Sequence, residues 1–244
     1  MPDSPPFLSV IVGATSPIAA AYAVACAKDG HALVLAGRHP ADLERIAADL
    51  RLRYQVSAQV MFYDASVIGD GRRLAGELAH RDITSVVAFH GIMGGLEDFA
   101  RMLQVNCVSI AELFEALADD AIKARRSPVL AAISSVAGDR GRQSNYPYGA
   151  SKAALDAYLS GLRNRLYPSG IRVLTIKPGF VRTRLSAGKV NPHSFLLAEP
   201  AQVAADIRRA IKGSGDVIYT RWFWSPIMMI IRCLPESLFK RMKL

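Results

Sequence analysis

The sequence has little cysteine and no long apolar run. Its three cysteines (Cys26, Cys107 and Cys233) are scattered without a CxxC spacing, each in an apolar or helical context. That pattern suits small buried side chains in a reducing compartment and offers no metal site. No run of about 18 apolar residues could span a bilayer. The segment MPDSPPFLSV also lacks the basic region and apolar run of a secretory signal, so we expect a cytoplasmic chain.

Linkers, charge blocks, internal repeats and low-complexity tracts are also absent. The 244 residues fit one α/β domain, and 51% of them are apolar, which is enough for a sizeable core. The net charge of +9 can indicate nucleic acid, anionic lipid or anionic ligands. Because the basic residues are dispersed and no motif interleaves them with aromatics, we expect no nucleic-acid binding.

Short β-branched runs alternate with longer helical patterns along the chain. Strands are expected near 7–12, 32–36, 58–62, 84–88, 128–134 and 171–176. Runs such as SVIV, LVLA and VLAAIS are continuously apolar, which is typical of strands covered on both faces. The pattern predicts one α/β domain over 1–220 with a doubly wound parallel sheet. Ligands bind such sheets beyond the carboxyl ends of the strands.

The turn after the first strand, VGATSPIAAAYAVACAKDG, could hold a diphosphate. Gly13 permits a sharp turn, and the start of the alanine-rich helix presents backbone N–H groups and a positive dipole end. Candidate contacts are Gly13, Thr15, Ser16 and Ile18. The alternative is an ordinary turn capped by Thr15 or Ser16, with Pro17 in the first helical turn. A lone glycine does not decide between the two.

The segments after the second and third strands add two candidates. LVLAGRHPADLERIAADL has no acidic residue at the end of its strand to bind a free ribose 2′-hydroxyl, and offers Arg38, which suits a 2′-phosphate. This favours NADP(H), with NAD(H) as the alternative cofactor and a surface arginine as the other interpretation. Asp64 could touch the adenine edge or begin a helix.

Four residues in order resemble the short-chain dehydrogenase/reductase family, and the resemblance covers almost the whole chain. Asn106 lies in LQVNCVSIAELF, Ser135 precedes Tyr148 by thirteen residues, and Lys152 completes YGASK. The resemblance implies a Rossmann-like fold and a nicotinamide-dependent ketone/alcohol oxidoreductase. It implies that Tyr148 gives a proton, Ser135 stabilises the carbonyl oxygen, Lys152 also holds the cofactor ribose, and Asn106 anchors a water through which the proton is replaced.

Other segments resemble the family's cofactor site in part. IKPGFVRT matches the Pro-Gly turn, which implies that four residues hold the nicotinamide end: Pro178, Gly179, Val181 and Thr183. GATSPIA, by contrast, keeps only Gly13 of the usual three glycines, and AFHG keeps only Gly91 of the usual Asn-Asn-Ala-Gly. A nucleotide site remains the expectation, and the unusual turn keeps a non-catalytic NADP-sensing scaffold as an alternative.

The pair Tyr148 and Lys152 has the spacing that proton transfer needs. They are one helical turn apart on a helix expected to begin near Pro147, so their side chains share a face. A neighbouring ammonium and an oxidised nicotinamide both favour phenolate. We therefore expect the pKa of Tyr148 to move from about 10 toward neutrality, where it can act as an acid or a base.

Two arginines, Arg140 and Arg142, lie on the loop between Ser135 and Tyr148. Loop arginines are usually solvated, but these also offer forks for a phosphate, so they are candidate contacts for an anionic substrate. His90 is expected to be a packed residue near the cofactor.

The tail over 221–244, RWFWSPIMMIIRCLPESLFKRMKL, extends beyond the minimal fold. Two tryptophans and a phenylalanine open an apolar run that is too short to span a membrane, and a basic amphipathic piece follows Pro235. The pattern predicts an amphipathic helical extension lying on a membrane surface, at the inner face of the cell membrane. A helix docked on its own domain or on a second subunit is the alternative.

The tail, the arginine loop and KPGFVRTRL together resemble a branch of the family that reduces a keto-sugar carried on a polyprenyl phosphate. The resemblance implies an anionic, lipid-linked ketone substrate, a flavoprotein oxidase as partner, and a role in cell-wall biosynthesis. A homo-oligomer is also expected. The alternative within enzymes is a reductase of another apolar ketone, either steroid-like or acyl.

Overall fold

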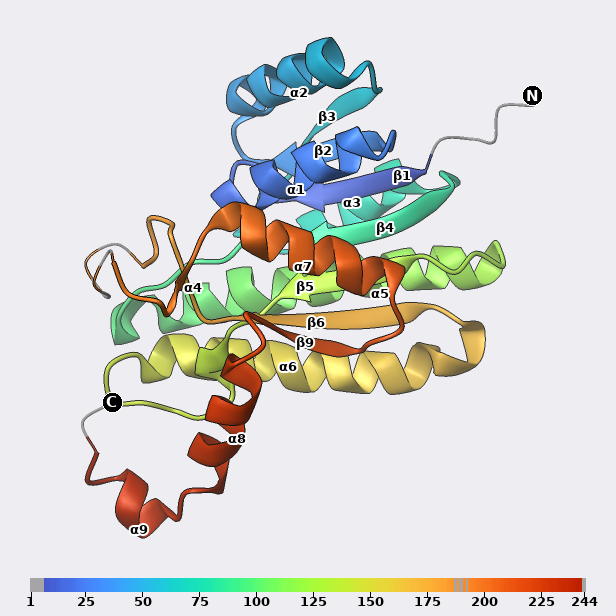
Figure 1. The fold of residues 1–244 in the computed structure, drawn as a ribbon. Coiled ribbons are helices and arrows are strands. Elements are labelled where there is room, and N and C mark those ends of the chain that lie inside the picture. The colour runs from blue at the N-terminus through green and yellow to red at the C-terminus, as the bar shows by residue number, and fades with distance from the viewer. Residues whose placement is uncertain (1–6, 187, 189–190, 192, 243–244) are drawn as a thin grey trace.

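The chain folds around a seven-stranded parallel sheet (Figure 1). The computed structural model describes residues 7–186, 188, 191 and 193–242. The strand order is β3-β2-β1-β4-β5-β6-β9, and all neighbours pair in parallel. The strands are β1 (Leu8–Val12), β2 (Ala32–Gly37), β3 (Ala58–Phe62), β4 (Ile83–Ala88), β5 (Val129–Ile133), β6 (Arg172–Pro178) and β9 (Val217–Thr220).

Helices cover both faces of this sheet. The bounds are α1 (Pro17–Lys28), α2 (Pro40–Tyr54), α3 (Asp70–Leu78), α4 (Phe99–Leu103), α5 (Ser109–Lys123), α6 (Tyr146–Leu166) and α7 (Pro200–Lys212), with short turns η1 (Leu96–Asp98), η2 (Gln104–Val108), η3 (Val136–Gly138) and η4 (Tyr167–Ser169). Successive strand residues point to opposite faces. In β1, Ile11 packs with α1, α2 and α7, whereas Val10 and Val12 pack with α3, α5 and α6. The doubly wound α/β fold expected from the apolar strands is therefore confirmed.

The six expected strands are all present, and one more was missed. β9 is short and only its last residue, Thr220, is buried, so it lacks the continuously apolar run that marks the central strands. A separate pair, β7 (Phe180–Val181) and β8 (Leu197–Ala198), follows the main sheet's β6. Of the three cysteines expected to be buried, Cys26 is buried, Cys107 is half-buried and Cys233 is exposed, so the expectation is wrong for Cys233.

The tail forms two helices, α8 (Trp224–Cys233) and α9 (Glu236–Phe239), which lie to one side of the sheet (Figure 1). Trp224 and Met228 are buried against Val136 and pack with Phe180, so the docked arrangement of α8 is the one observed. Lys243 and Leu244, at the end of the expected extension, lie outside the described residues. No helix in the described ranges is long and apolar enough to cross a bilayer.

Candidate active site

One cavity of about 690 Å³ opens at the carboxyl ends of the strands. Parallel strands bring all their carboxyl ends to one edge, so residues far apart in sequence meet there. The cavity is lined by fifteen of the seventeen candidates from the sequence: Gly13, Thr15, Ser16, Ile18, Arg38, Asp64, Gly91, Ser135, Arg142, Tyr148, Lys152, Pro178, Gly179, Val181 and Thr183. Asn106 and Arg140 do not line it.

The turn between β1 and α1 requires its glycine. Gly13 has φ +77°, and a Cβ there would lie 2.7 Å from the backbone nitrogen of His90. Its N–H donates to the carbonyl of Ala36 at 2.8 Å, which fixes the turn against β2. Pro17 lies in the first turn of α1, where the absence of an N–H costs no helical bond. The unsatisfied N–H groups at the start of α1 therefore face the cavity and suit an anion.

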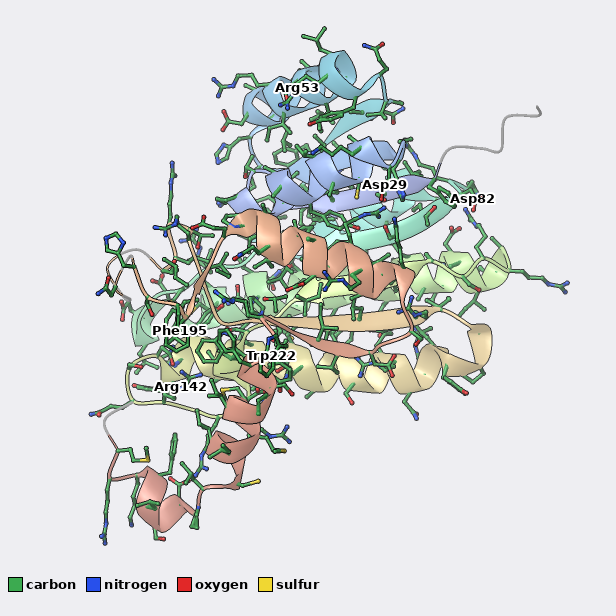
Figure 2. All side chains as sticks on the ribbon, viewed as in Figure 1. Asp29, Arg53, Asp82, Arg142, Phe195 and Trp222 are labelled. Carbon is green, nitrogen blue, oxygen red and sulfur yellow. The ribbon has the colours of Figure 1, made fainter. Side chains whose placement is uncertain are left out.

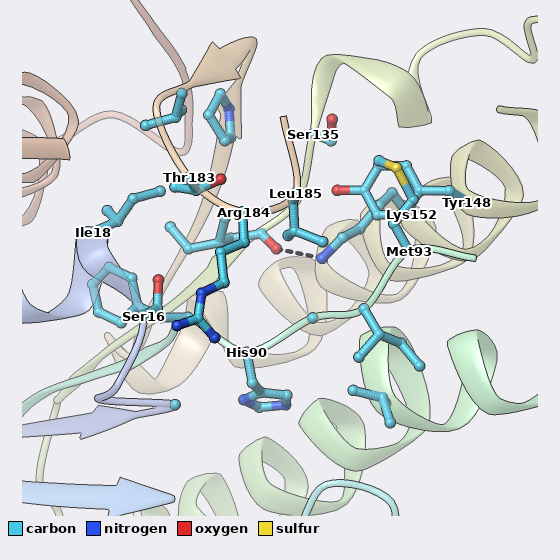
Figure 3. Close-up of a pocket in the computed structure, with 18 of the residues that line it drawn as sticks. Ser16, Ile18, His90, Met93, Ser135, Tyr148, Lys152, Thr183, Arg184 and Leu185 are labelled. Atoms are coloured by element: carbon cyan, nitrogen blue, oxygen red, sulfur yellow. Dashed lines mark hydrogen bonds between the residues drawn. The ribbon is translucent and has the colours of Figure 1, made fainter. Parts of the chain in front are cut away.

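Ser135 and Tyr148 meet on one side of the cavity (Figure 3). Ser135 follows β5, and its Oγ accepts from the N–H of Ala137 at 3.1 Å. Burial raises the pKa of Tyr148 to about 12, and a hydrogen bond with Ser135 partly opposes the rise. The expected shift toward neutrality is thus not found in the chain alone, because burial and the Asp156 carboxylate both raise the pKa of Tyr148. A phenol that keeps its proton is suited to act as an acid.

Lys152 lies one turn after Tyr148 on α6, as its spacing predicted. Its Nζ donates to the carbonyl of Ile133 at 2.8 Å, which anchors the side chain at the end of β5 (Figure 3). The nitrogen is 6.0 Å from the centroid of the Tyr148 ring. Burial lowers the pKa of Lys152 to about 8, and the carboxylate of Asp156 opposes that change. The ammonium is therefore partly charged near pH 8.

Asn106 fastens two segments together beneath the cavity. It lies in the π-helical turn η2, and its Nδ2 donates to the carbonyl of Ile92 and to the hydroxyl of Ser151, both at 2.9 Å. Its Oδ1 accepts from the N–H of Ile92 at 2.8 Å. The side chain thus ties the segment after β4 to α6. Its part in replacing the proton through a water stays a prediction.

The comparisons agree with this geometry. The model of the short chain dehydrogenase family matches residues 8–193. The chain belongs to the short-chain dehydrogenase family. An uncharacterized oxidoreductase of Mycobacterium tuberculosis is 33% identical over 225 residues, covering 87% of this chain and 88% of that protein. One from Streptomyces coelicolor is 30% identical over 248 residues, covering 98% and 97%. A short-chain dehydrogenase from Sphingobium yanoikuyae, solved in complex with NADPH, has the same fold, with a TM-score of 0.80 at 22% identity over 95% of this chain and 97% of that one.

The two loop arginines of this short-chain dehydrogenase have different surroundings. Arg140 points to the tail: its Nη1 donates to the carbonyls of Ile231 at 2.7 Å and Leu234 at 2.6 Å, and its guanidinium lies 3.8 Å from the ring centroid of Phe239. The expectation that Arg140 contacts substrate is therefore wrong in this arrangement. Arg142 does line the cavity. Its Nε is buried without a hydrogen-bond partner among the described residues.

The cavity also holds cations that the sequence reasoning missed. Arg184, on the loop after β7, lies between Ser16 and His90 in Figure 3, and Arg101 of α4 lines the cavity near Asp64. Arg184 comes immediately after Thr183, which was already a candidate contact for the nicotinamide end, so its position in the sequence could have indicated its place in the cavity. Nothing in the sequence around Arg101 indicates its place, because α4 is brought to the cavity only by the tertiary fold.

His90 is a packed residue, as expected. Its Nε2 is 3.0 Å from the hydroxyl of Ser109, and its ring packs against Tyr63 with centroids 5.4 Å apart. Burial lowers the pKa of His90 to about 3, so the imidazole is neutral at physiological pH. Its neutral ring forms part of the cavity wall and adds no charge to it.

Proposed function

We propose that this chain reduces a ketone to an alcohol with NADP(H) in the cavity above the sheet. The observation that carries the proposal is the meeting of Ser135, Tyr148 and Lys152 in the cavity that Gly13 and Arg38 also line. The nicotinamide cofactor, when bound, supplies the hydride. In this direction negative charge grows on the carbonyl oxygen, so a donor aimed at that oxygen lowers the barrier.

The side chains divide the remaining work. Ser135 can donate to the carbonyl oxygen, because its hydroxyl hydrogen can turn from the Tyr148 oxygen to the substrate in the cavity that both residues line. Tyr148 holds its proton at neutral pH, since its pKa is about 12, and transfers it to the oxygen as charge develops there. Lys152 donates to the cofactor ribose, and its ammonium favours the phenolate that remains.

The charge of the cavity supports NADP(H) over NAD(H). Arg38 lies just beyond β2, where an adenosine ribose would sit, and Arg101 and Arg184 line the same space. Within the described part of the chain, none of these three arginines forms an ion pair. Arg38 and Arg101 lie near the carboxylate of Asp64, and the three guanidinium groups outnumber it. Such a cavity suits a ligand that carries a diphosphate and a 2′-phosphate.

A cofactor-binding experiment tests this proposal. We expect Arg38→Ala to weaken NADPH by roughly 1.5 to 3 kcal/mol, since only NADPH has the 2′-phosphate, and to leave NADH nearly unchanged. Cofactor fluorescence titration measures both dissociation constants, and Arg45→Ala on the exposed surface of α2 is a matched control. Equal losses for the two cofactors would remove Arg38 from the 2′-phosphate site.

For the substrate, we propose a keto-sugar on a polyprenyl phosphate. The support is the resemblance to the reductase subunit of the bacterial decaprenylphosphoryl-ribose epimerase, together with one contact. Arg142 lines the cavity, where a phosphate could accept a hydrogen bond from its guanidinium. A flavoprotein oxidase would supply the ketone. Activity on an extracted lipid-linked keto-sugar that is lost in Arg142→Met, and kept on a neutral ketone, is the expected result.

We further propose that the tail rests on an anionic membrane. Figure 2 shows Phe195, Trp222 and Arg142 at the same end of the molecule. The tail exposes the apolar side chains of Trp222, Met229, Ile230 and Leu238 and the basic side chains of Arg232, Lys240 and Arg241, and Phe195 is exposed as well. Such an edge would sit in the interface near the lipid headgroups.

Vesicle sedimentation tests the membrane proposal. The intact chain should bind anionic phospholipid vesicles, and the double change Met229→Ser with Ile230→Ser should release it without altering NADPH binding. Leu52→Ser, an exposed apolar residue on α2, is the control. Binding should weaken with salt, since each Lys or Arg near the surface contributes about 1 kcal/mol that salt screens. A chain that ignores these vesicles at low salt has no such interface.

A further inference from the structure

A buried cluster of charges lies behind the catalytic residues. Lys177, near the end of β6, has its Nζ 2.5 Å from Asp139 and 2.9 Å from Asp156. The hydroxyl of Tyr219 in β9 donates to Asp139 at 2.9 Å. The side chains of the two carboxylates and the lysine are all largely shielded from solvent, with exposed fractions of 2%, 16% and 11% for Asp139, Asp156 and Lys177.

This cluster joins the segments that carry Ser135, Lys152 and the Pro-Gly turn. Asp139 is four residues after Ser135, and Asp156 is one helical turn after Lys152 on α6. Lys177 directly precedes Pro178. A Cβ on Gly138 would lie 2.8 Å from the carboxylate of Asp156 and 3.0 Å from the backbone of Lys152, so the loop packs tightly on the helix at this point. Only glycine permits that approach without a shift of the loop or the helix.

The cluster carries one negative charge in excess. Asp139 approaches the ammonium of Lys177 more closely than Asp156 does and also receives the Tyr219 hydrogen bond. One carboxylate charge is therefore uncompensated among Asp139, Asp156 and Lys177, and Asp156 lies one helical turn after Lys152 on α6. We infer that Asp156, held by Asp139 and Lys177, is a positioning residue that keeps Lys152 charged for ribose binding and proton transfer.

The other groups around these side chains do not replace this charge. Lys152 is faced by Tyr148 on its own helix, by Cys107 of η2 and by His90 after β4. Burial keeps the first two protonated and the third neutral at neutral pH, because it raises the pKa of Tyr148 and Cys107 and lowers that of His90. Asp156 is also near Arg163 and Ser134. Among these groups, Asp156 is the carboxylate one helical turn from Lys152 on α6, and its charge opposes the lowering of the Lys152 pKa by burial.

The inference rests on the proposed cofactor site, and pH-dependent NADPH binding tests it separately. In the unaltered protein the affinity should fall as the pH rises through about 8, where Lys152 loses its proton. Asp156→Asn should move that midpoint down by roughly one pH unit, since an opposite charge nearby raises the pKa of a lysine. Asp156→Glu should largely restore the midpoint. Asp119→Asn, which removes an exposed carboxylate of α5, should leave it in place.

The outcomes distinguish a failure of the proposed function from a failure of the role given to Asp156. If the unaltered protein binds no NADPH, the proposed function fails. If it binds NADPH and Asp156→Asn lowers the melting temperature but leaves the midpoint near that of the unaltered protein, Asp156 is only structural and the inference fails. If Asp156→Asn does not fold, Asp139→Asn is the variant to test. Lys177 then pairs with Asp156 alone, so the midpoint of NADPH binding should shift in the same direction by a smaller amount.

Discussion

Replacing Arg140 with alanine should release the tail from the catalytic loop. Arg140 donates to the carbonyl of Ile231, which is among the four carbonyls that the end of α8 leaves without helical partners, and to that of Leu234, which follows the helix. It also stacks on Phe239 of α9. The side chain is 14% exposed, so these contacts are largely shielded from water.

The magnitude follows from these contacts. Each bond to a carbonyl contributes about 1 kcal/mol net, and the ring contact contributes roughly 1 kcal/mol. The ion pair with Glu236 adds little, since that carboxylate is 74% exposed and solvated. The sum of about 3 kcal/mol corresponds to a roughly 100-fold larger undocked population of the tail.

Hydrogen exchange measures this population directly. In Arg140→Ala, the amides of α8 should exchange roughly 100-fold faster, while those of the central strands keep their rates. Arg232→Ala removes a basic side chain from the exposed surface of α8 and serves as the control. Unchanged protection of α8 in Arg140→Ala would show that Trp224 and Met228 alone hold the tail, and would refute the assignment of Arg140 as its anchor.

Three further changes test the site itself. Tyr148→Phe should abolish ketone reduction while the NADPH dissociation constant changes by no more than a few-fold, and turnover above about a tenth of the unaltered rate would contradict its role as the acid. Ser135→Ala should lower kcat by on the order of 100-fold, the loss expected for one donor to a growing oxyanion; an unchanged kcat would exclude that role. His90→Gln should make the free energy of unfolding depend less on pH below 6.5. Because burial depresses the pKa of His90 from 6.5 to about 3, the unfolded chain binds a proton that the folded chain does not, and stability falls as the pH drops below 6.5. Between pH 6.5 and 4, urea denaturation should show that the unaltered protein loses roughly 3 kcal/mol of unfolding free energy that the variant does not lose. His193→Gln, at an exposed position, should lose stability as the unaltered protein does.

Local patterns in the sequence were enough to predict the sheet and the catalytic group. The strands were recognisable because each is an apolar run between helical patterns, and Tyr148 and Lys152 because their relation depends only on the helical period. Ser135 and Gly13 follow strands that end at the same edge, so the topology alone brings them near. β9 was missed because a short strand at the sheet edge needs no continuous apolar run.

Contacts between distant segments account for the errors. Arg140 and Arg142 are two residues apart and looked equivalent. The tail, about ninety residues later, accepts hydrogen bonds from Arg140 at two carbonyls, whereas Arg142 touches the tail at Met228 and lines the cavity. Arg101 reaches the cavity only because α4 packs there. The pKa of Tyr148 depends on how deeply the folded chain buries it, which residue spacing does not indicate.

The two interpretations of the tail are compatible, because they concern different faces of α8. Trp224 and Met228 are four residues apart, so they share one face, and this face is buried against the loop that follows Ser135. Met229 and Ile230 project elsewhere and are exposed by more than half of their surface. A membrane that takes up the second face would therefore leave the first one docked. In that case the substrate's lipid would stay in the bilayer while its anionic head reaches Arg142, and binding to vesicles would not require the catalytic loop to open.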